Sequence, residues 1–407
     1  MTINIPDSNR FTRRRAQKLG SDPVSRECEC NQGWVILFYK YLDPAQTTVT
    51  PDEVYQEAVW QETQGTALGL SGKVRVAQEG LNVTVAGTEA AILAYIDAIS
   101  RRPWLQDEHL ADDNDSVNSS QLPQPPFANA VVQRRYLFFK PSPGCVHVFD
   151  GLSIKIVHEI CPLGYPDVTV KNTSWPQPPV DGNSQVPTHA IPVGKLAPDA
   201  FHIQLKSALE ISRPTLGQFT NAPAGQVDSL DHITPDQSVV LLDARNYYES
   251  RIGHFQSAIC PPIRKFSSLP EYLQRHRDKL RGKTVLTYCT GGIRCEKLSS
   301  YIRDKLYADD AMPHETGIKQ VWMLEGGIHN YMEWIKHSDL LSPAVSRADP
   351  PLLALSPDPK SFFIGRNYVF DARQSLALPA SCAQANPRPA LSGRFVAVSK
   401  HDASDWV

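Results

Sequence analysis

Residues 287–297 read Thr-Tyr-Cys-Thr-Gly-Gly-Ile-Arg-Cys-Glu-Lys and join a predicted strand to a predicted helix. The run from Lys283 to Tyr288 is apolar and β-branched, which favours a buried strand, and Cys295 to Leu306 carries apolar residues at helical spacing. Cys289 therefore lies at a turn between a strand and a helix. This layout is typical of an activated cysteine thiolate.

Three features of this loop favour the ionised form of Cys289. The first backbone N–H groups of a helix have no partner inside the helix, and here they point toward the sulfur. Gly291 and Gly292 let the backbone curl around it, and Arg294 adds a positive charge. A free cysteine has a pKa of about 8.5, so we expect Cys289 to be appreciably ionised at neutral pH. The alternative, a buried structural thiol, has no use for such a loop.

The length of the loop disfavours a phosphatase. A cysteine phosphatase holds phosphate with an arginine at the sixth position after its cysteine, whereas here that position is Cys295 and the arginine comes one residue earlier. The shorter loop resembles the active-site loop of the rhodanese family, whose cysteine carries sulfur as a persulfide. On this resemblance Cys289 and Arg294 are the predicted catalytic residues. The other predicted loop residues are Thr290, Gly291, Gly292, Ile293 and Cys295.

Two further segments, 239–259 and 321–334, extend the rhodanese resemblance to about a hundred residues. In rhodanese-like folds Asp243 and Arg245 end a strand beside the loop, so we expect them to pair as structural supports. His254 is expected to hydrogen-bond in the same region. Cys295 either packs under the loop as a small apolar side chain or acts as a resolving thiol for an oxidised Cys289.

The N-terminal half predicts an α+β unit of ferredoxin-like or acylphosphatase-like type, in the order strand, helix, strand, turn, strand, helix. The expected strands are 34–41, 72–77 and 83–86, and the expected helices are 51–69 and 89–100, the second capped by Thr88. Residues 131–139 and 152–157 are predicted to supply the remaining strands. The predicted fold class is thus an N-terminal α+β domain followed along the chain by an α/β rhodanese domain with a parallel sheet.

Motifs outside the rhodanese unit narrow the resemblance to one subgroup. In chain order they are 72–87, 154–160, 196–202 and 365–373. They are similar to segments of the tRNA uridine hydroxylases, whose eukaryotic relatives are called rhodanese-domain-containing proteins. The resemblance implies a tRNA substrate, molecular oxygen as co-substrate, and conversion of the wobble uridine to 5-hydroxyuridine.

The resemblance is incomplete at its C-terminal end. Many relatives continue into a cluster of cysteines with metal-ligand spacing, but here only Cys382 follows. The chain has no Cys-x-x-Cys pair, Cys28 and Cys30 would need distant partners to bind metal, and no dinucleotide or iron-binding motif is present. The sequence therefore predicts no metal site and no resident cofactor.

The loop chemistry alone leaves two activities open. In the first, the Cys289 thiolate adds to C6 of a flipped uracil, C5 meets an oxidant, and loop amides with Arg294 hold the charge on the pyrimidine carbonyl. In the second, Cys289 passes persulfide sulfur, as in a sulfurtransferase. A third possibility, a silent binding module, is hard to reconcile with an intact loop. The N-terminal motifs favour the hydroxylase.

Length supports several domains, because 407 residues exceed the size at which one core keeps growing. The predicted parts are a polar tail (1–30), the acylphosphatase-like domain (31–165), a linker with an irregular segment (166–230), the rhodanese domain (231–340) and a C-terminal extension (341–407). Three acidic, Ser/Asn/Gln-rich or Pro/Gly-rich inserts, 105–129, 175–185 and 214–226, are expected to be mobile loops.

Charge and cysteine usage limit the partners and the compartment. A net charge of -2 leaves room only for a local nucleic-acid patch, and residues 264–305 hold eleven Lys or Arg against four acids. Arg264, Lys265 and Lys297 are the predicted RNA-binding residues. Eight scattered cysteines indicate a reducing compartment and no apolar run suits a membrane span, so we expect a cytoplasmic protein. The basic N-terminus leaves organellar targeting open.

Overall fold

The structure, a computed structural model, describes residues 33–108, 110, 130–171, 191–211, 230–308, 310, 317–337 and 361–377. The polar tail with Cys28 and Cys30, the inserts 175–185 and 214–226, most of the insert 105–129, and Cys382 lie outside the described residues. Of that first insert, residues 105–108 form part of a 3-10 helix, Pro103–Glu108.

The N-terminal unit is a mixed five-stranded sheet in the order β4-β1-β3-β2-β5. Its elements are β1 (Trp34–Tyr41), α2 (Pro51–Ala67), β2 (Ser71–Ala77), β3 (Gly80–Gly87), α3 (Glu89–Ser100), β4 (Ser142–Pro143) and β5 (Leu152–Ile156). Strand β3 is antiparallel to both β1 and β2, and β5 is parallel to β2. This arrangement confirms the predicted acylphosphatase-like order, including the N-cap of α3 by Thr88.

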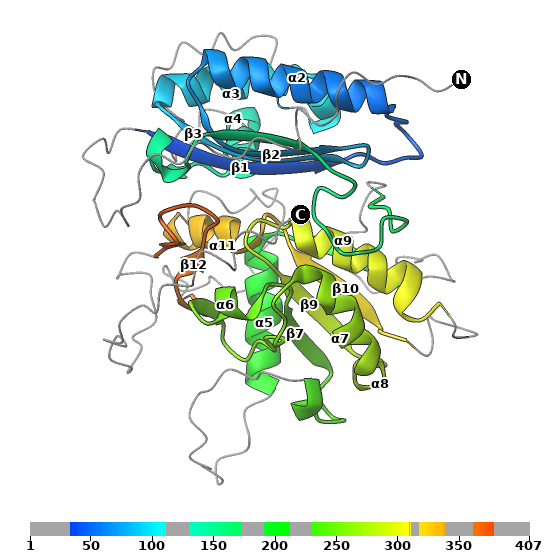
Figure 1. The fold of residues 1–407 in the computed structure, drawn as a ribbon. Helices are drawn as coiled ribbons and strands as arrows, with labels where there is room; N and C mark the ends of the chain where they lie inside the picture. The colour runs from blue at the N-terminus through cyan, green and yellow to red at the C-terminus, as the bar shows by residue number, and fades with distance from the viewer. Residues whose placement is uncertain are drawn as a thin grey trace, which may run out of the picture.

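One face of this sheet forms the core of the N-terminal domain. Alternate residues such as Phe38, Val74 and Val83 are buried in a cluster with apolar side chains of α2 and α3. The opposite face of the sheet looks toward the rhodanese domain (Figure 1). Residues on that face therefore lie between the two domains.

The prediction of a strand at 131–139 is wrong, because Ala130–Phe139 forms helix α4. Tyr136 and Phe139 are the buried positions of this segment, and their spacing of three residues places them on one side of a helix. The ring of Phe139 packs on Phe38 at 5.0 Å, and the place beside β1 is taken by the short strand β4. The strand predicted at 152–157 is confirmed by β5.

The second unit is a parallel sheet in the order β6-β10-β9-β7, as predicted for a rhodanese domain. Its strands are β6 (Val193–Leu196), β7 (Val239–Asp243), β9 (Thr284–Tyr288) and β10 (Gln320–Leu324). Helices α5 (Pro198–Ile211) and α11 (Gly327–Lys336) share a core cluster with one face. Helices α7 (Leu269–Arg275) and α9 (Ile293–Tyr301) share a cluster with the other, and α8 (Arg277–Leu280) follows α7.

Two boundaries of the rhodanese domain differ from those drawn on the sequence. Strand β6 and helix α5 were assigned to the linker 166–230, but β6 pairs along its whole length with β10 and so belongs to the sheet. The C-terminal extension returns to the domain, since β11 (Phe363–Gly365) pairs with β8 (Gly253–Phe255). A hairpin of β12 (Asn367–Tyr368) and β13 (Ser375–Leu376) follows it. Within the described residues, no helix has the length and apolarity that a bilayer span requires.

Replacing Gly80 by Ala tests the turn between β2 and β3. Gly80 has φ +139°, and a Cβ there would collide with the Lys40 carbonyl oxygen of β1. We expect Gly80→Ala to lower the free energy of unfolding of the domain by about 2 kcal/mol or more in urea titrations. Gly69→Ala is the matched control, because its φ of +64° is also positive but no atom lies within 4 Å. Equal losses in both variants would contradict the role of the close approach.

Candidate active site

Cys289 follows β9 directly, at the carboxyl edge of the parallel sheet. The next residues form a tight loop that ends at Gly292, the N-cap of α9 with φ +102°. A Cβ at Gly291 would come within 2.6 Å of Leu37, and one at Gly292 within 2.6 Å of the Tyr39 hydroxyl. A Cβ at either position would therefore displace a side chain of β1, and at Gly292 the positive φ also favours glycine.

A second glycine turn supports the loop from the rhodanese side. The Ile328 N–H donates to the Cys289 carbonyl at 2.9 Å, and the His329 N–H donates to the Thr290 carbonyl at 3.1 Å. Gly327 has φ +65°, and a Cβ there would meet the Cys289 carbonyl oxygen. The Gly-Gly turn that follows β10 thus holds the backbone on both sides of the Cys289–Thr290 peptide.

The environment of Cys289 stabilises a thiolate. The Gly292 N–H donates to the sulfur at 3.1 Å. Burial alone would raise the pKa of the Cys289 thiol, but a hydrogen bond from the Cys295 thiol, the Arg294 charge and the amides of Cys295 and Arg294 outweigh it. Together they lower the pKa to about 6. Such a cysteine is mostly ionised at neutral pH.

Arg294 is engaged by a carboxylate and not by the sulfur. Its two terminal nitrogens donate to Glu249 at 2.6 and 2.7 Å, and one of them also reaches the Thr290 hydroxyl at 3.2 Å. Both side chains of the pair are almost fully buried. The contact of Arg294 with a pyrimidine oxyanion stays a prediction, and in this arrangement both terminal nitrogens of Arg294 are engaged by Glu249. Arg294 fixes the loop and lowers the Cys289 pKa through its charge.

Glu249 is the residue of this pair that sequence analysis left out of the site. Glu249 lies in α6 (Tyr247–Ser250), where its carboxylate also accepts a hydrogen bond from the N–H of Asn246 in a capping box. The sequence pattern Asn-x-x-Glu before Arg251 was visible as a capping box. The pairing of Glu249 with Arg294 could not be predicted from the sequence, because 45 residues separate them.

Cys295 lies beneath the loop with no exposed surface, in the same core cluster as Cys289. Burial and the neighbouring Cys289 raise its pKa, so it remains a thiol and donates to the Cys289 sulfur. Cys295 thus combines the predicted apolar packing with a polar contact to the reactive atom. All five cysteines that the structure describes are free thiols.

The predicted supporting residues lie one strand away from the loop. Asp243 and Arg245 form a fully buried ion pair at 2.7 Å, and Arg245 also donates to the Gly253 carbonyl. Asp243 is paired in register with Tyr288, the residue before Cys289. One ring nitrogen of His254 lies 3.0 Å from the Ser250 carbonyl. These contacts hold the end of β7 and the start of β8 beside the loop, and none of them reaches the sulfur.

The N-terminal domain closes the site. The Tyr39 hydroxyl donates to Glu296 at 2.6 Å, Tyr41 reaches the Ile293 carbonyl at 3.4 Å, and Lys297 pairs with Glu79 at 2.5 Å. Burial and then the Glu296 carboxylate raise the pKa of Tyr39, so the phenol stays a donor. Cys289 has no exposed surface in this closed arrangement. The thiolate is thus ionised but covered by the N-terminal domain.

The site provides little for a metal ion. Among the residues that the structure describes, no three His, Cys, Asp or Glu side chains are grouped as metal ligands would be. The polar groups around the loop are instead paired with one another.

Two protein-family comparisons match the two domains in turn. The UPF0176 acylphosphatase like domain matches residues 34–160, and the Rhodanese-like domain matches residues 226–333. The rhodanese-like domain-containing protein 6 of Arabidopsis thaliana is 30% identical over 84% of this chain and 43% of its own length. The chain thus combines these two domains, and it is similar over most of its length to proteins named tRNA uridine(34) hydroxylases.

Bacterial proteins also match most of this chain. A tRNA uridine(34) hydroxylase of Synechocystis is 29% identical over 70% of this chain and 71% of its own length. One of Onion yellows phytoplasma is 28% identical over 74% of this chain and 68% of its own length. The chain spans less than half of the plant relative and about two thirds of these bacterial ones.

The three predicted RNA-binding residues differ in their exposure to solvent. Arg264 and Lys265 are exposed on the segment before α7. Lys297 is fully buried and pairs with Glu79 at 2.5 Å and with Glu159 at 3.5 Å. In this closed arrangement the charge of Lys297 joins α9 to the N-terminal domain, so its contact with RNA stays a prediction.

Exchanging Cys295 tests the source of the low Cys289 pKa. Cys295→Ala removes a donor to the thiolate, so the Cys289 pKa should rise from about 6 toward the value of a free cysteine. Cys295→Ser keeps a donor and should shift the midpoint much less. The measurement is the ultraviolet absorbance of the thiolate against pH, with Cys289→Ala subtracted. An unchanged midpoint in Cys295→Ala would contradict the proposed hydrogen bond.

Proposed function

We propose that this protein hydroxylates C5 of the wobble uridine of tRNA, with Cys289 as the nucleophile. The observation that carries the proposal is the lowered Cys289 pKa in a loop whose amides and thiol donor face the sulfur. Similarity supplies the substrate, since relatives that match most of this chain are named tRNA uridine(34) hydroxylases. A thiolate is a strong nucleophile for the polarised C5–C6 double bond of uracil.

The first step is addition of the Cys289 thiolate to C6 of the uracil. This step forms a C–S bond and places the electron pair of the double bond on C5 and the C4 carbonyl, as an enolate. Arg294 is held by Glu249, so the enolate oxygen must be met by backbone N–H groups of the loop. Donors fixed in advance stabilise a developing oxyanion without reorganisation.

The second step transfers oxygen from an oxidant at the peroxide level. The C5 enolate attacks one oxygen of hydrogen peroxide, which forms the C5–OH bond and breaks the O–O bond, and the other oxygen leaves as water after protonation. Loss of the C5 proton and expulsion of the thiolate from C6 then restore the double bond and free Cys289. Molecular oxygen can supply the peroxide only with two electrons and two protons, which we assign to a thiol-class reductant from solution.

Access is the main physical requirement that this function places on the structure. A base must leave its stack to reach the loop, and the closed arrangement leaves the sulfur with no exposed surface. The contacts in the way come from β1 and from Glu79 at the turn before β3. We therefore propose that the N-terminal sheet moves away from α9 when tRNA binds.

The names of the relatives favour the hydroxylase over the persulfide sulfurtransferase, which the loop chemistry by itself also allows. The two functions differ in their product. Thiosulfate:cyanide turnover without any change in tRNA nucleosides would establish the sulfurtransferase instead.

Removal of the thiol is the direct test of the proposed activity. We expect Cys289→Ser and Cys289→Ala to lose 5-hydroxyuridine formation by at least about three orders of magnitude, as for other essential nucleophiles. Cys145→Ser is the control, because that thiol lies in the N-terminal domain beside His147. Mass spectrometry of nucleosides from tRNA incubated with enzyme, oxygen and a dithiol gives the readout. Full activity in Cys289→Ala would overturn the mechanism.

Loosening the contact between Glu79 and Lys297 tests the proposed opening. Glu79→Gln leaves buried Lys297 with only the longer contact to Glu159, so the closed state loses part of its stabilisation. We expect alkylation of Cys289 by a neutral haloacetamide to become several-fold faster, because one kcal/mol changes a population about fivefold. Asp167→Asn, which removes an exposed pair with Lys305, should leave the rate unchanged. Equal rates in all three proteins would argue against gating by this contact.

A further inference from the structure

Three cations lie together on the face of the N-terminal sheet that looks toward the rhodanese domain. Lys73 and Arg75 are alternate residues of β2, and Lys155 of β5 is paired in register with Arg75. Their neighbours Val74, Val76 and Ile154 are buried, so the cations point away from the helices. Lys73 is exposed, while Arg75 and Lys155 are half-buried.

None of these three cations forms an ion pair with any residue that the structure describes. The one hydrogen bond from them is a long contact of Arg75 to its neighbouring carbonyl, at 3.5 Å. Burial and then the charge of Arg75 lower the pKa of both Lys73 and Lys155. The acidic groups near Lys73 are Asp150 and Asp371, and Asp371 is already bound by Arg373. The group therefore holds uncompensated positive charge, which favours an anionic ligand.

A series of aromatic rings runs from the catalytic loop to the surface of the rhodanese domain. The guanidinium of Arg294 lies 5.6 Å from the Phe370 ring, which contacts Tyr368 at 5.0 Å. Tyr368 contacts Tyr248 at 5.6 Å. The Tyr248 ring in turn lies 5.9 Å from the Tyr247 ring, and the guanidinium of Arg264 lies 5.9 Å from the Tyr247 ring.

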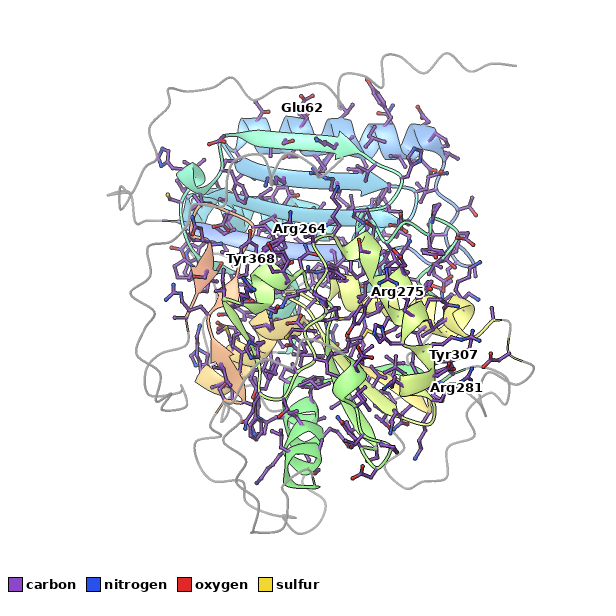
Figure 2. The ribbon with its side chains drawn as sticks, turned by 60° about the horizontal axis from the view of Figure 1, so that its bottom comes forward. Glu62, Arg264, Arg275, Arg281, Tyr307 and Tyr368 are labelled. Atoms are coloured by element: carbon purple, nitrogen blue, oxygen red, sulfur yellow. The ribbon has the colours of Figure 1, made fainter. Side chains whose placement is uncertain are left out.

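The inner end of the series, at Tyr368 and Phe370, lies on the side of the rhodanese domain next to the N-terminal sheet, and α6 with Tyr247 and Tyr248 lies farther from that sheet (Figure 1). Figure 2 labels Arg264 and Tyr368 near each other, away from Arg281 and Tyr307. In Figure 1, β12, which carries Tyr368, lies beneath the same sheet. Phe370 directly precedes Asp371, which acts electrostatically on Lys73, so the two sets of side chains border one region.

We propose that the three cations and the aromatic series form the two sides of a binding surface for an unpaired RNA loop, which leads to Cys289. The proposal rests on the proposed function for its substrate class. The cations contact the phosphates of the strand. The rings of Tyr368 and Tyr248 stack with bases that neighbour the reacting uridine.

The chemistry of the two sides favours a single strand over a duplex. Exposed bases stack on aromatic side chains and on arginine, whereas the bases of a helix are stacked on each other. Cations without acidic partners attract phosphates and release bound counterions when they bind. Arg264, which the sequence had already placed in an RNA patch, lies at the outer end of the series.

The first test neutralises the cations while keeping side-chain length. Lys73→Gln, Arg75→Gln and Lys155→Gln are combined, and binding of an unmodified tRNA transcript is followed by fluorescence anisotropy at several salt concentrations. Loss of three phosphate contacts should weaken binding about tenfold or more and reduce the slope of log K against log salt by about 2. The matched control combines Lys206→Gln, Lys319→Gln and Lys336→Gln, three exposed lysines of the rhodanese domain outside the basic segment 264–305. Equal effects of both triple variants would overturn the proposal.

The second test concerns the aromatic side. Tyr368→Leu removes a stacking ring and Tyr368→Phe keeps it, so only the leucine variant should bind the tRNA several-fold more weakly. A single-stranded oligoribonucleotide should compete for the wild-type protein better than an RNA duplex of equal length. Equal competition by both, together with equal binding of the two variants, would exclude base stacking at Tyr368.

The two proposals can fail separately. If the wild-type protein binds tRNA through the three cations but forms no 5-hydroxyuridine, the hydroxylase function is wrong and the surface stands. If the triple variant binds tRNA like the wild type and hydroxylates it at the same rate at low tRNA concentration, the surface is wrong and the function stands. The thiolate titration of Cys289 checks that the triple variant keeps an intact catalytic loop.

Discussion

The buried ion pair between Arg294 and Glu249 is the contact on which the catalytic loop depends. It joins the first turn of α9 to α6, and it also holds Thr290, so both ends of the loop are tied to one carboxylate. A buried arginine without a partner costs several kcal/mol, so the pair fixes the loop geometry strongly. The Gly292 N–H and the Cys295 thiol are thereby directed at the sulfur. Arg294 contributes charge to the thiolate while its guanidinium stays bound to Glu249.

Burial of Cys289 disfavours its ionised form, and nearby hydrogen-bond donors compensate for this by stabilising the thiolate. Desolvation favours the neutral thiol, so an ionised sulfur beneath a second domain needs donors that do not depend on water. The loop amides and Cys295 supply them. Closure by β1 also explains the two loop glycines, since any Cβ at Gly291 or Gly292 would push Leu37 or Tyr39 away. The two domains are therefore parts of one active site.

The sequence predicted those features whose causes are local. Strands β1, β2 and β3 and helix α3 follow from apolar periodicity and a capping threonine, and the thiolate follows from glycines beside a helix start.

The predictions that failed concern residues whose partners lie far away in the sequence. The segment 130–139 has the composition of a strand, but Tyr136 binds Glu333 and Phe139 packs on Phe38, and these contacts select a helix. Strand β6 was missed because its partner β10 lies more than a hundred residues later. The pairing of Lys297 with Glu79 was missed for the same reason.

The N-terminal sheet carries both the contacts that close the active site and the cations proposed to bind RNA. Binding of tRNA can therefore open the site. Tyr39, Tyr41 and Lys297 hold the N-terminal sheet on α9, and an unliganded protein thus keeps its thiolate away from soluble oxidants. Lys73, Arg75 and Lys155 lie on the same sheet, so a strand bound to them acts on the element that covers the sulfur. A ligand shifts an equilibrium only by its difference in affinity between the two states. A bound strand whose uridine must reach Cys289 favours the open state, and by reciprocity any change that weakens closure strengthens RNA binding.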